Sequence, residues 1–218
     1  MSNRLIAIGD IHGCSVALRA ILTAIDPRPD DTIVTLGDYV DRGPDTRGVI
    51  NQLIDLSKRT HLVPLLGNHE EMMLKVLSGE QNYQDWLKFG GVETLESYGF
   101  DGDLNFLPPD HTKFFESLVD YYVEGDFFFT HASYNPNLPL DLQPADVLRW
   151  HSLRDGIPPR HMSGATAIVG HTANHDGEVL DAEHLLCIDT FCYGGGFLTA
   201  LDVRQLAVWQ VCKDGYLR

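Results

Sequence analysis

The chain has 218 residues, with 31 acidic and 16 basic side chains, so its formal net charge is −15. This length suits a single domain over residues 1–218 that buries a full core without disulfides. The acidic surplus argues against a nucleic-acid partner, whose binding depends on Lys and Arg, and against binding to an anionic membrane surface.

The chain shows no sequence signal for export or membrane insertion. Its N-terminus has only a short apolar run before a charged motif, which is not typical of a secretory signal. No run of about 18 apolar residues predicts a transmembrane helix. The four cysteines have no CxxC spacing, so neither a zinc knuckle nor a disulfide framework is indicated. We therefore expect reduced thiols and a cytoplasmic protein.

The first third of the chain alternates predicted strands and helices. Short apolar runs predict strands at 4–10, 31–38 and 61–67. Apolar residues at helical spacing predict helices at 15–25 and 45–59. This alternation is typical of a mainly parallel sheet covered by helices, so we expect an α/β fold.

The rest of the chain changes pattern twice. Residues from about 70 to 120 contain three helix-like stretches and no clear strand, which indicates a helical insertion. Residues 133–165, rich in Pro, Asn and Asp, are expected to form a long ordered loop, and such loops are often functional. Strands are expected to return around that loop, and the last two should form an antiparallel hairpin. Their ranges are 126–132, 166–172, 185–190, 197–203 and 206–212.

Polar side chains with metal-binding potential follow the predicted strands. In open α/β sheets, ligand sites form at the carboxyl ends of strands, so we expect these side chains to meet. Each could be an ordinary polar turn, but that interpretation does not explain all of them together. In an extended chain, Asp10 and His12 would also face the same way, because they are two residues apart. The set is Asp10, His12, Asp38, Asn68, His131 and His171.

The six side chains supply carboxylate, imidazole and amide oxygen but no thiolate. Six ligands exceed what one tetrahedral zinc needs, so two divalent ions that share a carboxylate fit better. Mixed nitrogen and oxygen donors suit manganese, which we expect most, with iron or zinc as alternatives. Two ions about 3.5–4 Å apart are suited to in-line displacement at phosphorus. Arg42 is placed to bind a phosphate in a forked geometry.

Five short motifs carry a family resemblance. "GDIHG" (9–13), "GDYVDRG" (37–43), "GNHE" (67–70), "THA" (130–132) and "GHT" (170–172) resemble the phosphoprotein phosphatase branch of the calcineurin-like metallophosphoesterases. Their order and spacing match over nearly the whole chain. The resemblance implies a four-layer α/β/β/α sandwich with a helical insertion.

The resemblance also implies roles for individual residues. His69 would protonate the leaving group, oriented by Asp41. The resemblance assigns no role to Glu70, and its position leaves two possibilities, that it orients a neighbour or that it caps the following helix. Asp38 would bridge the two ions. The first ion would be bound by Asp10, His12 and Asp38, and the second by Asp38, Asn68, His131 and His171. Arg42 and Asn68 would contact the substrate phosphate. A second arginine is expected among Arg149, Arg154 and Arg160, and we favour Arg154.

The implied activity is hydrolysis of phosphate monoesters, with a serine/threonine protein phosphatase as the main hypothesis. Its substrate would be a phosphorylated protein or a small phosphoester. The alternative is a symmetrical bis(5'-nucleosyl)-tetraphosphate hydrolase, whose motifs look almost the same. That substrate should need extra cations, and the predicted insertion offers only Lys75, Lys88 and Lys113. A catalytically inactive metal-binding interaction module is the remaining hypothesis.

Overall fold

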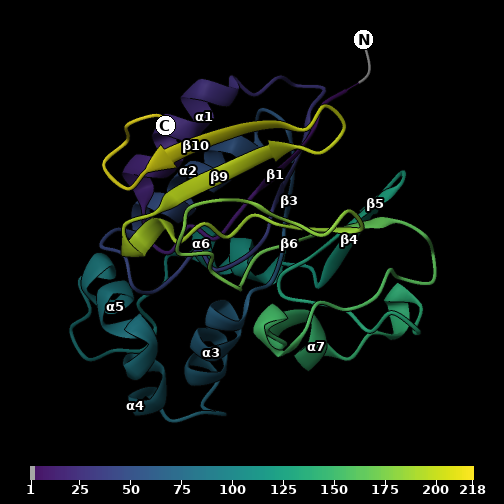
Figure 1. Ribbon diagram of the computed structural model, residues 1–218. Helices are drawn as coiled ribbons and strands as arrows, with labels where there is room; N and C mark the ends of the chain where they lie inside the picture. The colour runs from purple at the N-terminus through teal and green to yellow at the C-terminus, as the bar shows by residue number, and fades with distance from the viewer. Residues whose placement is uncertain (1–2) are drawn as a thin grey trace.

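The computed structural model describes residues 3–218 and contains two five-stranded sheets with helices around them (Figure 1). The first sheet has the order β10-β9-β1-β2-β3. Its β1, β2 and β3 are parallel, whereas β9 and β10 form the predicted antiparallel hairpin. The bounds are β1 Leu5–Ile8, β2 Thr32–Thr35, β3 His61–Pro64, β9 Phe197–Asp202 and β10 Ala207–Cys212.

The second sheet has the order β4-β5-β6-β8-β7. Its three central strands are parallel and its two edge strands are antiparallel. Both edge strands, β4 and β7, lie where the sequence pattern predicts no strand. A turn at Gly125, with φ 62°, folds β4 back onto β5. The bounds are β4 Tyr121–Glu124, β5 Phe127–Thr130, β6 Thr166–Val169, β7 Leu180–Asp181 and β8 Leu185–Cys187.

The alternation of side chains along the strands builds the layers. On β1, Ile6 and Ile8 pack with helices α1 (Ser15–Ile25) and α2 (Thr46–Ser57). The intervening Leu5 and Ala7 pack with residues of β5, β6 and β8 between the sheets. Both faces of β1 are therefore buried, as expected for a central parallel strand. The outer face of the second sheet is covered mostly by the 133–165 segment, which contains α7 (Ala145–Trp150). The expected α/β fold of two sheets and helices is confirmed.

The region from about 70 to 120 contains helices, as predicted. The first of them begins shortly after strand β3 ends (Figure 1). It includes an uncommon π-helical stretch at Leu87–Gly91, where Gly90 has φ 101°. Segments of this kind often occur at functional sites. The α-helices are α3 Asn68–Leu77, α4 Tyr83–Trp86, α5 Val92–Tyr98 and α6 Pro109–Glu116.

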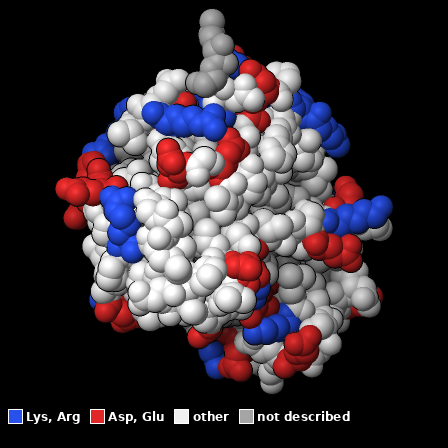
Figure 2. Space-filling model, turned by 90° about the vertical axis from the view of Figure 1, so that its right-hand side faces the viewer, with Lys and Arg blue, Asp and Glu red and all other residues white. Residues whose placement is uncertain are grey.

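The distribution of surface charge and the state of the cysteines are those of an ordinary globular protein. Figure 2 shows one face on which basic side chains are separated by acidic and uncharged ones, without a continuous basic stripe. None of the helices in residues 3–218 combines the length and apolar character needed to span a bilayer. All four cysteines are free in the described part of the chain, and three of them are buried.

Candidate metal centre

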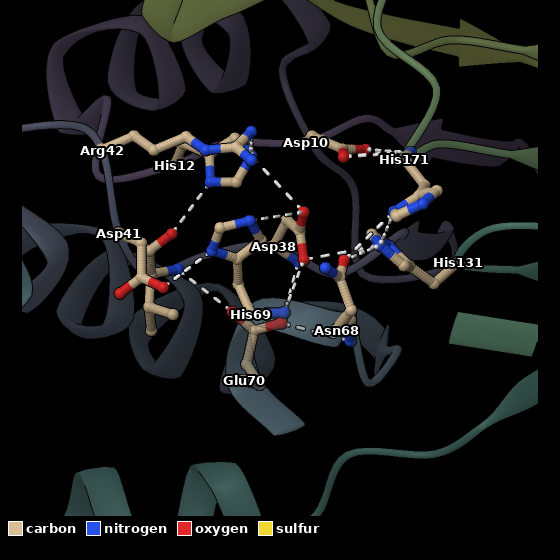
Figure 3. Close-up of polar contacts among 12 residues, drawn as sticks. Asp10, His12, Asp38, Asp41, Arg42, Asn68, His69, Glu70, His131 and His171 are labelled. Atoms are coloured by element: carbon tan, nitrogen blue, oxygen red, sulfur yellow. Dashed lines mark hydrogen bonds and ion pairs between the residues drawn. The ribbon is translucent and has the colours of Figure 1, made fainter. Parts of the chain in front are cut away.

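The carboxyl ends of strands from both sheets meet, and the candidate residues follow those ends (Figure 3). Several of them have a left-handed backbone, which residues other than glycine rarely adopt. Such strained positions tend to cluster at functional sites. They are His12, Asp38, Asp41, Arg42 and His171, with φ values of 42°, 51°, 69°, 68° and 63°.

One group of side chains brings three hydrogen-bond acceptors together. His131 Nε2 lies 2.9 Å from Asn68 Oδ1 and 3.2 Å from His171 Nδ1, which is itself 3.1 Å from Asn68 Oδ1. The other ring nitrogens face carbonyl oxygens, at 2.7 Å from Leu36 O for His131 and 3.2 Å from Trp150 O for His171. A nitrogen that faces a carbonyl carries the hydrogen, so in the neutral rings the converging nitrogens are acceptors.

Burial keeps these rings neutral. It lowers the pKa of His131 and lowers the pKa of His171 to about 4. Asp38 adds a carboxylate oxygen, with Oδ1 3.4 Å from His131 Nε2. Three or four acceptors that face one another without a donor repel, unless a cation lies between them. Imidazole nitrogens with amide and carboxylate oxygens are a suitable donor set for a divalent transition metal.

A second group forms on the other side of Asp38. His12 Nδ1 donates to Val40 O at 2.9 Å, which leaves Nε2 as an acceptor 3.4 Å from Asp38 Oδ2. The two oxygens of Asp38 therefore face two different groups, and this carboxylate is 2% exposed. A carboxylate in that position fits two neighbouring cations. The donor chemistry of this chain thus fits a binuclear divalent metal centre.

Asp10 is buried beside this centre, but its carboxylate faces the backbone. It accepts hydrogen bonds from His171 N at 3.0 and 3.2 Å. The expectation that an extended chain aligns Asp10 with His12 is wrong, because the left-handed turn at His12 sends the two side chains to different partners. Its proposed part in the first metal site therefore does not follow from that alignment.

A third buried carboxylate, Asp189, was missed by the sequence analysis. Burial, followed by the Asp189 and Asp38 charges, raises the pKa of Asp10 well above its usual value. Burial likewise raises the pKa of Asp189 to about 6. Three clustered buried carboxylates again call for nearby positive charge. The available signal was the position of Asp189 near the end of the predicted strand at 185–190, because Asp10 and Asp38 also end predicted strands.

His69 is held by Asp41, as the resemblance implies. Its Nδ1 lies 2.7 Å from Asp41 Oδ2, and its Nε2 faces the centre 4.0 Å from Asp38 Oδ2. Burial lowers the pKa of His69, but the Asp38 and Asp41 carboxylates outweigh burial and the net pKa is raised. A protonated Nε2 could donate to a substrate. The same nitrogen also lies within metal-binding range of His12 and Asp38, so geometry alone allows either role.

Asp41 is fixed by two residues of the helical region. Trp86 Nε1 lies 2.9 and 3.0 Å from its two carboxylate oxygens, and Thr94 Oγ1 donates to Oδ1 at 2.9 Å. The π-helical stretch also contributes, because the N–H of Arg42 donates to the Gly90 carbonyl at 3.1 Å. Neither Trp86 nor Thr94 has a local sequence signal, since each lies more than forty residues from Asp41.

Glu70 organises the loop that carries Asp38. Its carboxylate accepts N–H hydrogen bonds from Gly67 (3.1 Å), Asp38 (2.8 Å), Tyr39 (2.7 Å) and Val40 (3.1 Å). Glu70 is fully buried. It therefore orients its neighbours and, through the N–H of Gly67, also caps helix α3, so both expectations for Glu70 are confirmed.

The arginines occupy different environments. Arg42 Nη1 lies 3.0 Å from His12 Nε2, and its guanidinium lies 4.7 Å from the centre of the Tyr193 ring. Arg154 is exposed and donates to the Ala173 carbonyl at 3.0 Å, outside the candidate ligand groups. Arg149 is ion-paired with Asp120, and Arg160 donates to the Gly164 carbonyl. Arg42 is thus an arginine that the fold brings to the centre, and a second phosphate-binding arginine stays a prediction.

Comparison with known proteins identifies the family. Residues 3–203 match the model of the calcineurin-like phosphoesterases. A symmetrical bis(5'-nucleosyl)-tetraphosphatase of Janthinobacterium sp. (strain Marseille) is 38% identical over 267 positions, covering 94% of each chain. Serine/threonine-protein phosphatase 1 of Salmonella typhimurium is 37% identical over 86 residues, covering 38% of this chain and 37% of its own. Other bacterial tetraphosphatases match over about a quarter of their own length.

A solved structure supports the fold. A protein assigned provisionally as a diadenosine tetraphosphatase has a TM-score of 0.73 and 23% identity, covering 97% of this chain and 94% of its own.

These findings correct the expected activity. The relative that aligns over nearly the full length of both chains is named a tetraphosphatase, whereas the protein phosphatase matches little more than a third of this chain. The serine/threonine phosphatase hypothesis and the assignment to that branch are therefore wrong. The motifs misled because a metal centre and a phosphate-binding arginine serve both reactions. The chain belongs to the calcineurin-like phosphoesterases, a family of hydrolases.

Proposed function

We propose that this chain hydrolyses dinucleoside tetraphosphates symmetrically, cleaving the central anhydride to release two nucleoside diphosphates. The full-length similarity to a protein named for that activity supports the choice of substrate. The observation that carries the chemistry is the pair of acceptor groups on either side of Asp38. Their donor atoms suit two divalent ions, and such pairs serve displacement at phosphorus.

The proposed ligands follow the expected division around Asp38. When bound, the two ions would supply an activated water and neutralise the negative oxygens of the substrate. Manganese is the ion that we propose, because the donors are nitrogen and oxygen without thiolate. The first ion would be held by Asp10, His12 and Asp38, and the second by Asp38, Asn68, His131 and His171.

The other residues position the substrate and the proton. Arg42 would donate to the phosphate oxygens, and its stacking on Tyr193 limits where the guanidinium can lie. Asn68 would contribute an uncharged contact near the phosphate. His69 Nε2 would donate to the departing oxygen, while Asp41 holds Nδ1 and stabilises the protonated ring. Because the departing group is itself a phosphate, with a pKa of about 6, this donation is needed less than for an alkoxide.

The test is a product analysis with diadenosine tetraphosphate and the manganese-loaded protein. We expect ADP as the sole nucleotide product and a kcat/KM well above that for a phosphoserine peptide. Metal analysis should find two equivalents per chain. Formation of AMP and ATP, or a faster rate on the phosphopeptide, would contradict the proposal.

A further inference from the structure

A cavity of about 400 Å³ opens next to Arg42, on the side of the centre that carries His12. We propose that it binds one nucleoside diphosphate half of the substrate, and this inference rests on the proposed function. The metal centre itself can bind only the phosphates near the reacting bond, so the nucleoside ends need sites elsewhere. The residues that carry the inference are Ser15, Val16, Arg42, Tyr193, Lys213 and Asp214.

Arg42 links the cavity to the centre. This side chain lines the cavity and also reaches His12 Nε2 at 3.0 Å. A phosphate chain that starts at the centre can therefore pass Arg42 and enter the cavity without leaving a cationic environment. Among residues 3–218, Arg42 forms no ion pair with a carboxylate, so its guanidinium is available to an anionic ligand.

Lys213 supplies a second cation to the cavity lining. It forms no ion pair within the described chain, unlike Lys58, Lys75 and Lys88 on the helices. A turn fixes its backbone, since Gly215 N donates to Cys212 O and Cys212 N to Tyr216 O, both at 2.9 Å. Two cations without ion pairs in one cavity favour an anionic ligand, despite the net charge of −15 for the chain.

Ser15 adds a hydroxyl group to the cavity wall. The residue is 5% exposed, and its hydroxyl has no hydrogen-bond partner within residues 3–218. It is the first residue of α1, where the Cys14 side chain makes no capping hydrogen bond. A phosphate oxygen could accept from this hydroxyl and from the free N–H groups of the first turn, the usual environment of a bound phosphate.

The remaining walls suit a nucleoside. Val16, 49% exposed, and the half-buried Tyr193 ring offer apolar surface for a base. Asp214 offers a carboxylate to ribose hydroxyls, a contact that nucleotide sites often use. A volume of about 400 Å³ is also within the range of small-molecule sites, roughly 300–1,000 Å³. The combination of cations, hydroxyl, carboxylate and apolar surface matches a nucleoside diphosphate better than a lone phosphate.

The test compares the affinity of the protein for ADP with its affinity for inorganic phosphate, because phosphate would bind at the metal centre alone and would not use the cavity. Each is used as an inhibitor of p-nitrophenyl phosphate hydrolysis, and ADP binding is also measured by calorimetry on the manganese-loaded protein. We expect Lys213→Ala to weaken ADP about five- to tenfold relative to phosphate, as for loss of a charge-assisted hydrogen bond. Val16→Trp, which fills the cavity, should weaken ADP at least as much. Lys113→Ala, on the distant helix α6, is the matched control.

The outcomes separate this inference from the proposed function. If the protein releases ADP from the tetraphosphate but neither variant changes the ratio of ADP to phosphate affinity, the cavity is not the nucleoside site. If the protein does not cleave the tetraphosphate, the proposed function fails, while the ADP measurements still decide whether the cavity binds a nucleoside diphosphate. A thermal melt of each variant checks folding, and Lys213→Ala, at an exposed turn, keeps the test valid if Val16→Trp unfolds.

Discussion

The two sheets contribute to the metal centre in different ways. On the side of the first sheet, further residues fix each loop: Glu70 binds four backbone N–H groups, and Trp86 and Thr94 bind Asp41. On the side of the second sheet, each histidine ring has a single backbone anchor, Leu36 O for His131 and Trp150 O for His171.

This difference separates two tasks. Under the proposed function, proton transfer and phosphate binding need fixed directions, and burial and multiple hydrogen bonds on the side of the first sheet would provide them. A metal ion aligns its own ligands once bound, so the second side needs only rings with the correct tautomer. The comparison gives two expectations. Substitution of the residues that hold the loops of the first sheet should reduce turnover. Substitution of the residues around His131 and His171 should change metal affinity but little else.

The largest effect is expected at Asp38, which belongs to both sides. Asp38→Asn keeps the shape but removes the charge that faces both groups of acceptors. We expect loss of bound metal and a decrease in kcat/KM of about a thousandfold or more, since two-metal chemistry depends on both ions. Metal analysis and tetraphosphate turnover measure this. Asp55→Asn, at an exposed surface pair with Lys58, is the control. If the Asp38→Asn protein still binds two equivalents of metal, Asp38 does not bridge two ions.

Glu70→Gln tests how firmly the first side is fixed. An amide cannot accept all four N–H groups, and its own NH₂ would face some of them. We expect the free energy of unfolding to fall by about 2–4 kcal/mol, as for buried polar groups left without partners. Urea denaturation measures this, with the exposed Glu96→Gln as the matched control. A change no larger than that of the control would mean that the loop at 37–43 does not depend on Glu70.

His69→Asn tests the proposed role of the ring. The loss should depend on the leaving group: about a hundredfold for phenyl phosphate, whose phenoxide has a pKa near 10, and about tenfold for the tetraphosphate. Two equivalents of metal should remain bound. Loss of one equivalent would instead make His69 a ligand, and equal losses on both substrates would argue against proton donation.

The sequence predicted the parts of the fold that follow short, regular patterns. The apolar runs predicted β1, β2 and β3, and the final pair of strands gave the correct hairpin. The edge strands β4 and β7 were missed because β4 follows a helix after only a few residues and β7 has two residues. Pairing with a neighbour, rather than local pattern, makes them strands.

The site was predicted less completely than its motifs suggest. The candidate ligands were found because each lies at a strand end, and Asp189 was missed although it shares that position. Trp86 and Thr94 were missed because only folding brings them to Asp41. The substrate was predicted wrongly because the extra cations were expected in the helical insertion, which has few. Under the proposal above, Lys213 at the other end of the chain supplies one.

A matched pair of tryptophans gives the smallest effects and compares the two sides directly. Trp86 and Trp150 each donate an indole N–H to a carboxylate, of Asp41 at 2.9 Å and of Glu71 at 2.7 Å. Trp86→Phe should lower kcat about tenfold and leave KM nearly constant, because it loosens Asp41 and therefore His69. Trp150→Phe should change kcat by less than about twofold, since His171 contacts the backbone carbonyl and the indole is partly exposed. The pH profile of kcat should shift only for Trp86→Phe, which a purely structural role would not produce. If both substitutions lower kcat equally, the residues that support the two sides of the centre contribute equally to turnover, and the comparison is wrong.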